Sequence, residues 1–326
     1  MPDGSYTLKP SDFDPGNYAP GQKHCVTLEV ETPTGTVPLA VLLAQGAEPG
    51  PTLAATAAVH GDEYEGVRTL FEIFAELDPA AMSGALLAVP VANPPAFWNM
   101  SRCSPFDGEN LARAFPGRSA GSATEALAFA LDQALFAHAD FFIDLHSAGV
   151  RYVMPTMAGY HRPDRRSREA AFCFGAPVVW GHDNIGPGRT ISSCLARGIP
   201  FLYTEARGAG RIHADDLTVF RRGMKNLLAH LGIFAAAPEP AAPPVRLIGD
   251  GNTDYGLQTT VDGFFTPCVS LLEPVRRGQV IGRVHDLHGG VRERIIAPFD
   301  GAIGMLRVTP VVRAGDSLVL IAEVEE

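Results

Sequence analysis

Cysteine is scarce in this sequence, and the five cysteines form neither a disulfide pattern nor a metal-binding pattern. They are odd in number, spread along the chain and never spaced as CxxC: Cys25, Cys103, Cys173, Cys194 and Cys268. This arrangement is typical of reduced thiols in a cytosolic protein rather than of a disulfide framework. We therefore expect a cytoplasmic protein in which the cysteines are structural.

The sequence also lacks a long apolar run and an excess of positive charge. No stretch approaches the roughly 20 apolar residues of a membrane-spanning helix, and residues 1–20 do not resemble a signal peptide. The formal net charge is −10 at pH 7, whereas a nucleic-acid-binding protein needs a basic face to displace counterions from phosphates. We therefore expect neither a membrane nor a nucleic-acid partner. A small anionic substrate stays compatible, because a local arginine cluster can oppose the overall charge.

What the sequence does contain is a regular alternation of two kinds of segment. Hydrophobic residues make up 46% and charged residues 19% of the 326 residues, as in an ordinary folded protein. Apolar runs bounded by turn residues predict strands at 26–31, 37–44, 52–59, 85–91, 141–145, 177–180 and 200–204. Helical spacing of apolar residues predicts helices at 67–77, 123–138, 165–173, 191–197 and 215–233. The alternation predicts a doubly wound, mostly parallel mixed α/β sheet with helices on both faces.

The composition of the sequence changes after residue 236. Residues 237–244 are rich in proline, which interrupts both helix and sheet, and we predict that they form a linker. From 245 to 326, short apolar runs are separated by glycines, which predicts a smaller all-β domain. The α/β fold is then expected to occupy residues 1–236, with 1–45 supplying the leading β segments.

Three residues with metal-binding side chains follow two of the predicted strands. His60 comes directly after the strand at 52–59, Glu63 follows three residues later, and His146 comes directly after the strand at 141–145. Ligands bind at this carboxyl edge of open α/β sheets. Two histidines and one glutamate, with a fourth position open, form a catalytic zinc set that polarises a carbonyl and lowers the pKa of water. The alternative for HxxE alone is a pair of ordinary hydrogen-bonded side chains.

Asp144 stands two residues before His146. Both side chains therefore point to the same side of a strand, since side chains alternate along it. Asp144 is either a hydrogen-bond partner of a ligand histidine or a satisfied buried acid. The sequence leaves both alternatives open.

Four motifs occur in order along the chain. They are HGDEYEG at 60–66, NPPAFWNMSRCSPFDGENLARAFPG at 93–117, DLHSA at 144–148 and TEARGAG at 204–210. Together they resemble the succinylglutamate desuccinylase/aspartoacylase family, within the zinc carboxypeptidase-like superfamily. The resemblance covers about two-thirds of the chain. It implies a zinc carboxypeptidase-like catalytic domain, an added β-domain, and hydrolysis of amide bonds in N-acyl amino acids with one zinc.

The resemblance also implies roles for individual residues. It implies that His60, Glu63 and His146 bind one zinc ion per chain. It implies that Glu205, in TEARGAG, is the general base that takes a proton from water and passes it to the leaving amine. Without the motif, Glu205 would be interpreted as a solvated acid after a strand.

Two arginines match family residues that contact the substrate. Arg102 corresponds to the arginine that polarises the scissile carbonyl, and Arg113 to the one that binds a substrate carboxylate. The family usually has Asn directly before the second arginine, whereas this chain has Ala112, so Asn110 is a candidate replacement. Arg207 stands where relatives commonly have small residues and is a further candidate for substrate binding. The alternative for the arginines of this loop is a role as surface cations.

These features together predict a cytoplasmic zinc-dependent deacylase that cleaves the amide bond of a small N-acyl amino acid. Within the family, the motifs are most similar to bacterial deacetylases that act on N-acetylated diaminobutyrate. One alternative is a non-catalytic homologue that binds the small molecule, for which Ala112 is the only hint. The other is a metallocarboxypeptidase that acts on peptides. The acyl group, the amine and any self-association into a homo-oligomer are left open by the sequence.

Overall fold

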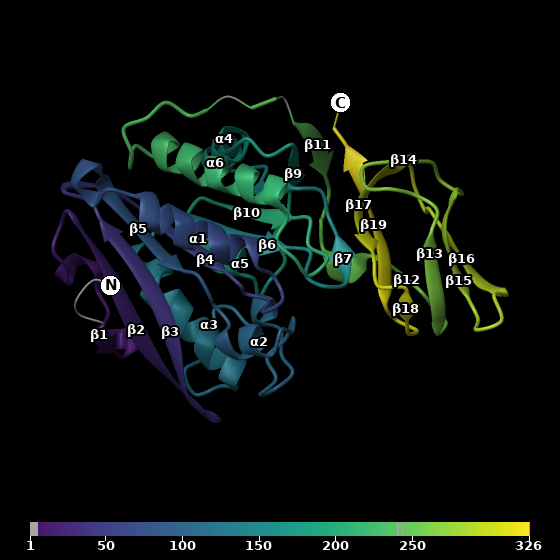
Figure 1. Cartoon of the computed structure of the whole chain (residues 1–326), viewed down its shortest axis with the longest axis horizontal. Coiled ribbons are helices and arrows are strands. Elements are labelled where there is room, and N and C mark those ends of the chain that lie inside the picture. The colour runs from purple at the N-terminus through teal and green to yellow at the C-terminus, as the bar shows by residue number, and fades with distance from the viewer. Residues whose placement is uncertain (1–5, 240, 243, 326) are drawn as a thin grey trace.

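The structure, a computed structural model, shows an α/β part and a C-terminal β region side by side (Figure 1). We define the C-terminal β region as residues 245–325. The structure describes residues 6–239, 241–242 and 244–325. The predicted domains and linker include positions that lie outside the described residues: 1–5, 240, 243 and 326.

A large mixed sheet runs through the α/β part. In spatial order its strands are β1 (Tyr6–Leu8), β2 (Gln22–Thr32), β3 (Gly35–Gln45), β5 (Ser83–Val89), β4 (Glu48–Ala57), β6 (Phe141–Ser147), β10 (Phe201–Ala206), β8 (Met157–His161) and β9 (Val178–His182). The central strands β5, β4, β6 and β10 are parallel to one another. Their side chains are almost all buried, because helices cover both faces of a parallel sheet.

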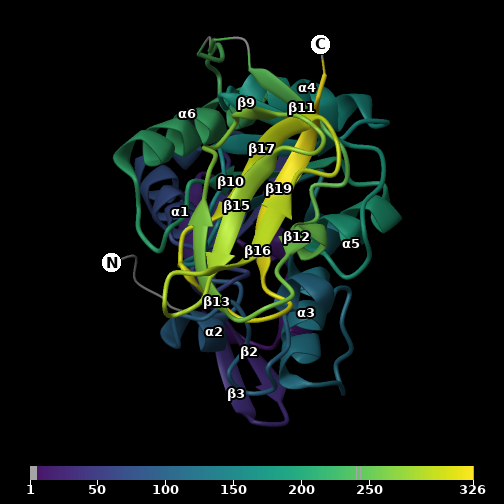
Figure 2. The same ribbon diagram turned by 90° about the vertical axis from the view of Figure 1, so that its right-hand side faces the viewer.

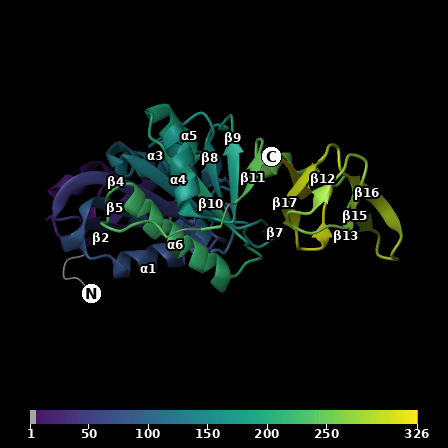
Figure 3. The ribbon, with the colours of Figure 1, turned by 90° about the horizontal axis from the view of Figure 1, so that it is seen from above.

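Helices lie on both faces of this sheet. One face carries α1 (Glu65–Glu76), α4 (Arg165–Phe174) and α6 (Ala214–His230), and the other carries α3 (Ala123–Ala134) and α5 (Thr190–Arg197). Figure 3 shows α1 and α6 on one side and α3 and α5 on the other. The start of α3 is set by Ser122 and Glu125, whose side chains form a capping box. The predicted doubly wound α/β fold is confirmed.

The predicted strands and helices up to residue 233 all correspond to observed elements, with ends that differ by a few residues. The predicted helix at 123–138 is shorter than expected, because α3 ends at Ala134 and a 3-10 turn covers Phe136–His138. Besides short 3-10 turns, four short elements are not predicted: β1, α2 (Pro94–Trp98), β7 (Tyr152–Val153) and β8. The sheet is mixed because β8 runs antiparallel to β10 and β3 runs antiparallel to β2 and β5.

The C-terminal β region continues the main sheet and adds a second one. Strand β11 (Val245–Ile248) pairs with β9 and with β19 (Ser317–Val324), and so joins the two parts of the molecule. Next to β19 lie β17 (Gly301–Arg307) and β12 (Leu257–Gln258), and β14 (Pro274–Val275) pairs with β17. A separate antiparallel sheet contains β16 (Val291–Ile296), β15 (Val280–His285), β13 (Gly263–Pro267) and β18 (Val311–Val312). The predicted all-β character is confirmed, whereas the boundaries of the linker and domains stay a prediction.

The C-terminal β region has its own apolar core, formed by both of its sheets. Phe265 and Ile281 from the separate sheet pack with Ile303 and Leu318 from the strands that continue the main sheet. Figure 2, viewed from this side, shows these strands in front of the α/β part. None of the described helices combines the length and apolar character that crossing a membrane requires.

Candidate active site

The carboxyl ends of the central parallel strands bring the predicted catalytic residues to one edge of the sheet. In the parallel pair β6–β10, His146 lies directly beside Glu205. Strand β4 is the other neighbour of β6, and the turn after it carries His60 and Glu63. This turn packs closely on α2, and its contact with the helix requires glycine at position 61. A Cβ atom on Gly61 would lie 2.0 Å from the backbone of that helix.

His60, Glu63 and His146 form a compact group with the composition of a metal site. Their ligand atoms all lie within 4.8 Å of one another. Glu63 Oε1 is 2.7 Å from His60 Nδ1, and Glu63 Oε2 is 2.8 Å from His146 Nδ1. Both imidazoles therefore direct Nδ1 toward the same carboxylate. Because two imidazoles and a carboxylate are the donors that a catalytic Zn²⁺ takes, this group can hold a metal ion.

The other nitrogen of each imidazole has an oxygen partner. His60 Nε2 lies 3.1 Å from Asn110 Oδ1, and His146 Nε2 lies 2.9 Å from Asp144 Oδ2. Asp144 is buried and also accepts hydrogen bonds from the hydroxyls of Thr56 and Thr190. When Nε2–H donates to these oxygens, Nδ1 keeps its lone pair for a metal. Asp144 is thus a hydrogen-bond partner of His146, the contact that the first of the two alternatives requires.

The charges around this group attract a cation. Burial opposes ionisation of Glu63, but His60 and His146 hold the pKa of its carboxyl well below the usual range. Burial also opposes protonation of His146, but the Asp144 and Glu63 carboxylates raise its pKa well above the ordinary value. Arg102 brings positive charge to the same atoms, with Nη1 3.2 Å from His60 Nδ1 and 3.5 Å from Glu63 Oε1. A metal ion bound at this group would bring positive charge to the same atoms.

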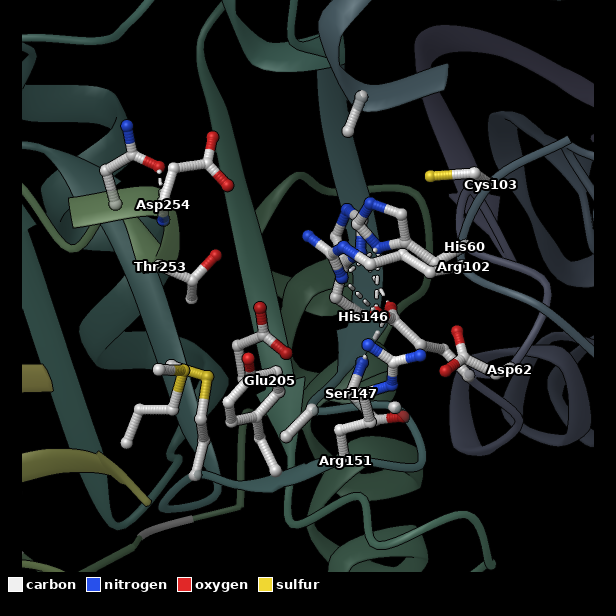
Figure 4. A pocket seen from close by; sticks show the side chains of 18 of the residues that line it. His60, Asp62, Arg102, Cys103, His146, Ser147, Arg151, Glu205, Thr253 and Asp254 are labelled. Carbon is white, nitrogen blue, oxygen red and sulfur yellow. Dashed lines mark hydrogen bonds and ion pairs between the residues drawn. The ribbon is translucent and has the colours of Figure 1, made fainter. Parts of the chain in front are cut away.

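Glu205 lies across the pocket from the histidine–glutamate group (Figure 4). Its Oε2 atom is buried and has no hydrogen-bond partner within the described part of the chain. Burial, followed by the nearby charge of Glu63, raises the pKa of Glu205 to about 8. A carboxyl group with a pKa near neutrality can both accept and donate a proton during a reaction.

One pocket connects these groups to the C-terminal β region. It has a volume of about 820 Å³, within the range of roughly 300–1,000 Å³ that small-molecule sites occupy. Five consecutive residues after β11, Asp250–Asp254, line it and are called here the C-terminal loop. The C-terminal β region also contributes Gln258, Met305, Gly315, Asp316 and Ser317. Both parts of the molecule are therefore needed to enclose the pocket.

The residues predicted to bind substrate do not gather at one point. Arg113 lines the pocket, but its Nε and Nη2 atoms donate to Asp254 Oδ2 at 2.9 and 2.6 Å. Asn110 contacts His60 and does not line the pocket. Arg207 also lies outside the lining, with Nη2 3.5 Å from a carboxylate of α6.

Arg189 lines the pocket although the sequence did not single it out. It stands at the N-cap of α5, and among the described residues it has no ion pair. A cation at a helix N-terminus opposes the helix dipole, so the position costs stability unless the charge has another use. That conflict with the usual helix-capping preference is the signal in the sequence that could have identified Arg189.

Comparison with known proteins is consistent with this geometry. The family model for the succinylglutamate desuccinylase/aspartoacylase catalytic domain matches residues 49–231. The chain therefore belongs to the succinylglutamate desuccinylase/aspartoacylase family, as the motifs predicted. It is 33% identical over 304 residues to the N-alpha-acetyl-L-2,4-diaminobutyric acid deacetylase of Halomonas elongata, an alignment that covers 91% of this chain and 89% of that protein.

Solved structures of similar proteins share the whole arrangement. A succinylglutamate desuccinylase from Silicibacter sp. TM1040 superposes with a TM-score of 0.85 at 28% identity, covering 95% of this chain and 96% of that one. The product-bound ectoine utilization protein EutE (DoeB) of Ruegeria pomeroyi superposes with a TM-score of 0.83 at 28% identity, covering 92% and 94%. The similarity therefore includes the C-terminal β region as well as the α/β part.

Proposed function

We propose that this protein is a zinc-dependent hydrolase that cleaves the amide bond of a small N-acyl amino acid. The observation that carries the proposal is the convergence of His60, Glu63 and His146 within 4.8 Å, opposite Glu205, whose Oε2 has no hydrogen-bond partner among the described residues. The Halomonas elongata relative is named as a deacetylase of an N-acetylated diamino acid, which supports the same class of reaction.

His60 and His146 would hold the zinc through Nδ1, and Glu63 through its carboxylate. When bound, zinc acts as a Lewis acid that polarises the amide carbonyl and lowers the pKa of water. The partners of the two Nε2 atoms, Asn110 and Asp144, keep the imidazoles in the orientation and tautomer that a ligand needs.

Proton transfer is assigned to Glu205. Its carboxylate accepts a proton as water adds to the amide carbon, and returns the proton to the amine nitrogen as the C–N bond breaks. Arg102 is assigned to the carbonyl oxygen, where its guanidinium donates a hydrogen bond as negative charge develops. Both assignments use side chains that line the same pocket.

A substrate carboxylate is assigned to Arg189, whose planar guanidinium lines the pocket without an ion pair among the described residues. The roles in substrate binding predicted for Arg113, Asn110 and Arg207 stay predictions. The contact of Asn110 with His60 favours orientation of a metal ligand instead.

The test is a hydrolysis panel with the purified full chain. N-acetyl and N-succinyl amino acids are incubated with the zinc-loaded protein, and released acid and amine are quantified. We expect turnover of at least one N-acyl amino acid, loss of turnover after removal of metal by a chelator, and recovery when zinc is restored. Binding without cleavage would favour a non-catalytic homologue, and release of C-terminal residues from peptides would favour a carboxypeptidase.

A further inference from the structure

The direction of proton transfer divides the pocket into two sides. Glu205 delivers its proton to the leaving amine, so the amine half of the substrate must lie beside Glu205. Figure 4 shows Thr253 and Asp254 on the Glu205 side, and Asp62 and Cys103 on the far side of the histidine–glutamate group. The C-terminal loop therefore faces the amine half of the substrate, and the far side faces the acyl half.

On the amine side, every nitrogen of the Arg113 guanidinium already has an acceptor. Nε and Nη2 donate to Asp254 Oδ2 at 2.9 and 2.6 Å, and Nη2 also donates to Asn252 Oδ1 at 3.3 Å. Nη1 donates to the carbonyl oxygen of Ala112 at 2.8 Å. The carboxylate of Asp254 thus occupies the position in which Arg113 would otherwise receive a substrate carboxylate.

The C-terminal loop is also held by contacts that do not involve Arg113. The backbone N–H of Asp254 donates to Asn252 Oδ1 at 3.1 Å, and the hydroxyl of Ser317 donates to the carbonyl oxygen of Thr253 at 3.3 Å. Just before the loop, His182 Nδ1 lies 2.6 Å from the carbonyl oxygen of Gly249. These contacts keep the Asp254 carboxylate beside Arg113 and restrict its movement away from the pocket.

The ion pair between Arg113 and Asp254 reduces the positive charge on the amine side of the pocket. With Arg113 neutralised by Asp254, we assign the substrate carboxylate to Arg189, one of the other cations that line the pocket. We propose that Asp254 is a specificity-determining residue that makes the site select N-acyl amino acids with one carboxylate over N-acyl derivatives of aspartate and glutamate. This inference rests on the proposed function.

The physical reason is the repulsion between a second substrate carboxylate and the half-exposed carboxylate of Asp254. A second carboxylate in the amine half would have to displace Asp254 from Arg113 or lose its hydration beside an existing carboxylate. A substrate with a single carboxylate pairs with Arg189 and leaves the Arg113–Asp254 pair intact. Discrimination therefore arises from a repulsive group placed in the pocket as well as from an attractive one.

The test compares two substrates of similar size, N-acetyl-L-2-aminobutyrate with one carboxylate and N-acetyl-L-aspartate with two. We expect Asp254→Asn to shift the ratio of their kcat/KM values at least tenfold toward the dicarboxylate, because Arg113 becomes available. The control Asp250→Asn removes one negative charge from the same loop and should shift the ratio less than threefold. The double variant Arg113→Gln/Asp254→Asn should return the ratio toward the wild-type value, because the released cation is gone.

An unchanged ratio in Asp254→Asn, or an equal shift in the Asp250→Asn control, would overturn the inference. So would a double variant that keeps the shifted ratio. Calorimetric binding of the free products, 2-aminobutyrate and aspartate, measures the same selectivity without turnover. Failure of hydrolysis with any N-acyl amino acid thus counts against the proposed function, whereas unchanged product selectivity counts against the role of Asp254.

Discussion

The α/β part and the C-terminal β region contribute to one pocket in different ways. The proposed metal donors and Glu205 stand at the ends of buried parallel strands or in the turn that follows one, where the sheet limits their movement. The C-terminal loop is irregular and is held by a few side-chain contacts. A reaction needs its groups held rigidly, whereas selectivity can be changed by altering a loop. We infer that the first part carries the chemistry and the second part the selectivity.

The largest expected effect is a loss of catalysis, without loss of zinc, when Glu205 in the α/β part is changed. Glu205→Gln should lower kcat by about 10²–10⁴-fold, the usual contribution of a general acid–base. Zinc content, measured by elemental analysis, should stay unchanged because Glu205 is not one of the donors. Glu323→Gln, an exposed change on β19, is the control and should leave kcat unaltered. A Glu205→Gln protein with the turnover of the wild type would rule out the proposed proton transfer.

A second expected effect concerns the metal site alone. Asp144→Asn removes the anionic acceptor of His146 Nε2–H, and should weaken zinc binding by about 10–100-fold. Competition with a fluorescent chelator measures this affinity, and Asp183→Asn on the surface is the control. Selectivity between mono- and dicarboxylate substrates should not change. Unaltered zinc affinity would assign Asp144 a purely structural role.

The third expected effect concerns the C-terminal loop. A Cβ atom on Gly251 would lie 2.5 Å from His182 Cε1, so Gly251→Ala must move the C-terminal loop. We expect KM to rise by about five- to tenfold while zinc affinity is kept, because the loop lines the proposed substrate pocket and the proposed metal donors lie outside the loop. Gly278→Ala is a matched control, because Gly278 also has a positive φ but has open space around the added atom. Loss of zinc from Gly251→Ala would contradict the division between the two parts.

The smallest expected effect is a stability change confined to the C-terminal β region. Burial opposes ionisation of Glu293, but hydrogen bonds from Thr259 and Thr260 lower the pKa of its carboxyl. A lowered folded-state pKa stabilises the protein above the unfolded pKa of about 4.3, and this stabilisation is lost as pH falls through the folded pKa.

Glu293→Gln should therefore reduce the free energy of unfolding by about 1 kcal/mol at neutral pH, and by less as the solution becomes more acidic than the unfolded pKa. Urea unfolding at several pH values measures the difference. Kinetic constants at neutral pH should not respond. An equal penalty at every pH would show that the lost interaction does not depend on the charge of Glu293.

Much of the fold follows from local patterns. The central strands are short apolar runs bounded by glycine or proline, and the helices have apolar residues at helical spacing, so both could be predicted. Strand β8 was missed because its five residues show no clear alternation, and its pairing with β10 joins segments distant in sequence. The predicted linker could not reveal that β11 would continue the main sheet.

The candidate site, too, could be predicted from the sequence only in part. His60, Glu63 and His146 could be predicted because they follow buried strands, and parallel strands end at one edge of a sheet. The long segment between α2 and α3 has no period from which to predict its path. Asn110, in that segment, lies against His60, a contact that the sequence did not predict.

By itself, the sequence determined most of the strands and helices and which strand ends carry candidate metal donors, because these properties depend on neighbouring residues. Only the tertiary structure decided which nitrogen of each histidine faces Glu63 and which partner Arg113 finds. Arg113 and Asp254 are 141 residues apart, and their contact depends on the path of the whole intervening chain. Local sequence patterns do not reveal which distant residues come into contact. The distribution of charge in the pocket therefore becomes known only from the folded structure.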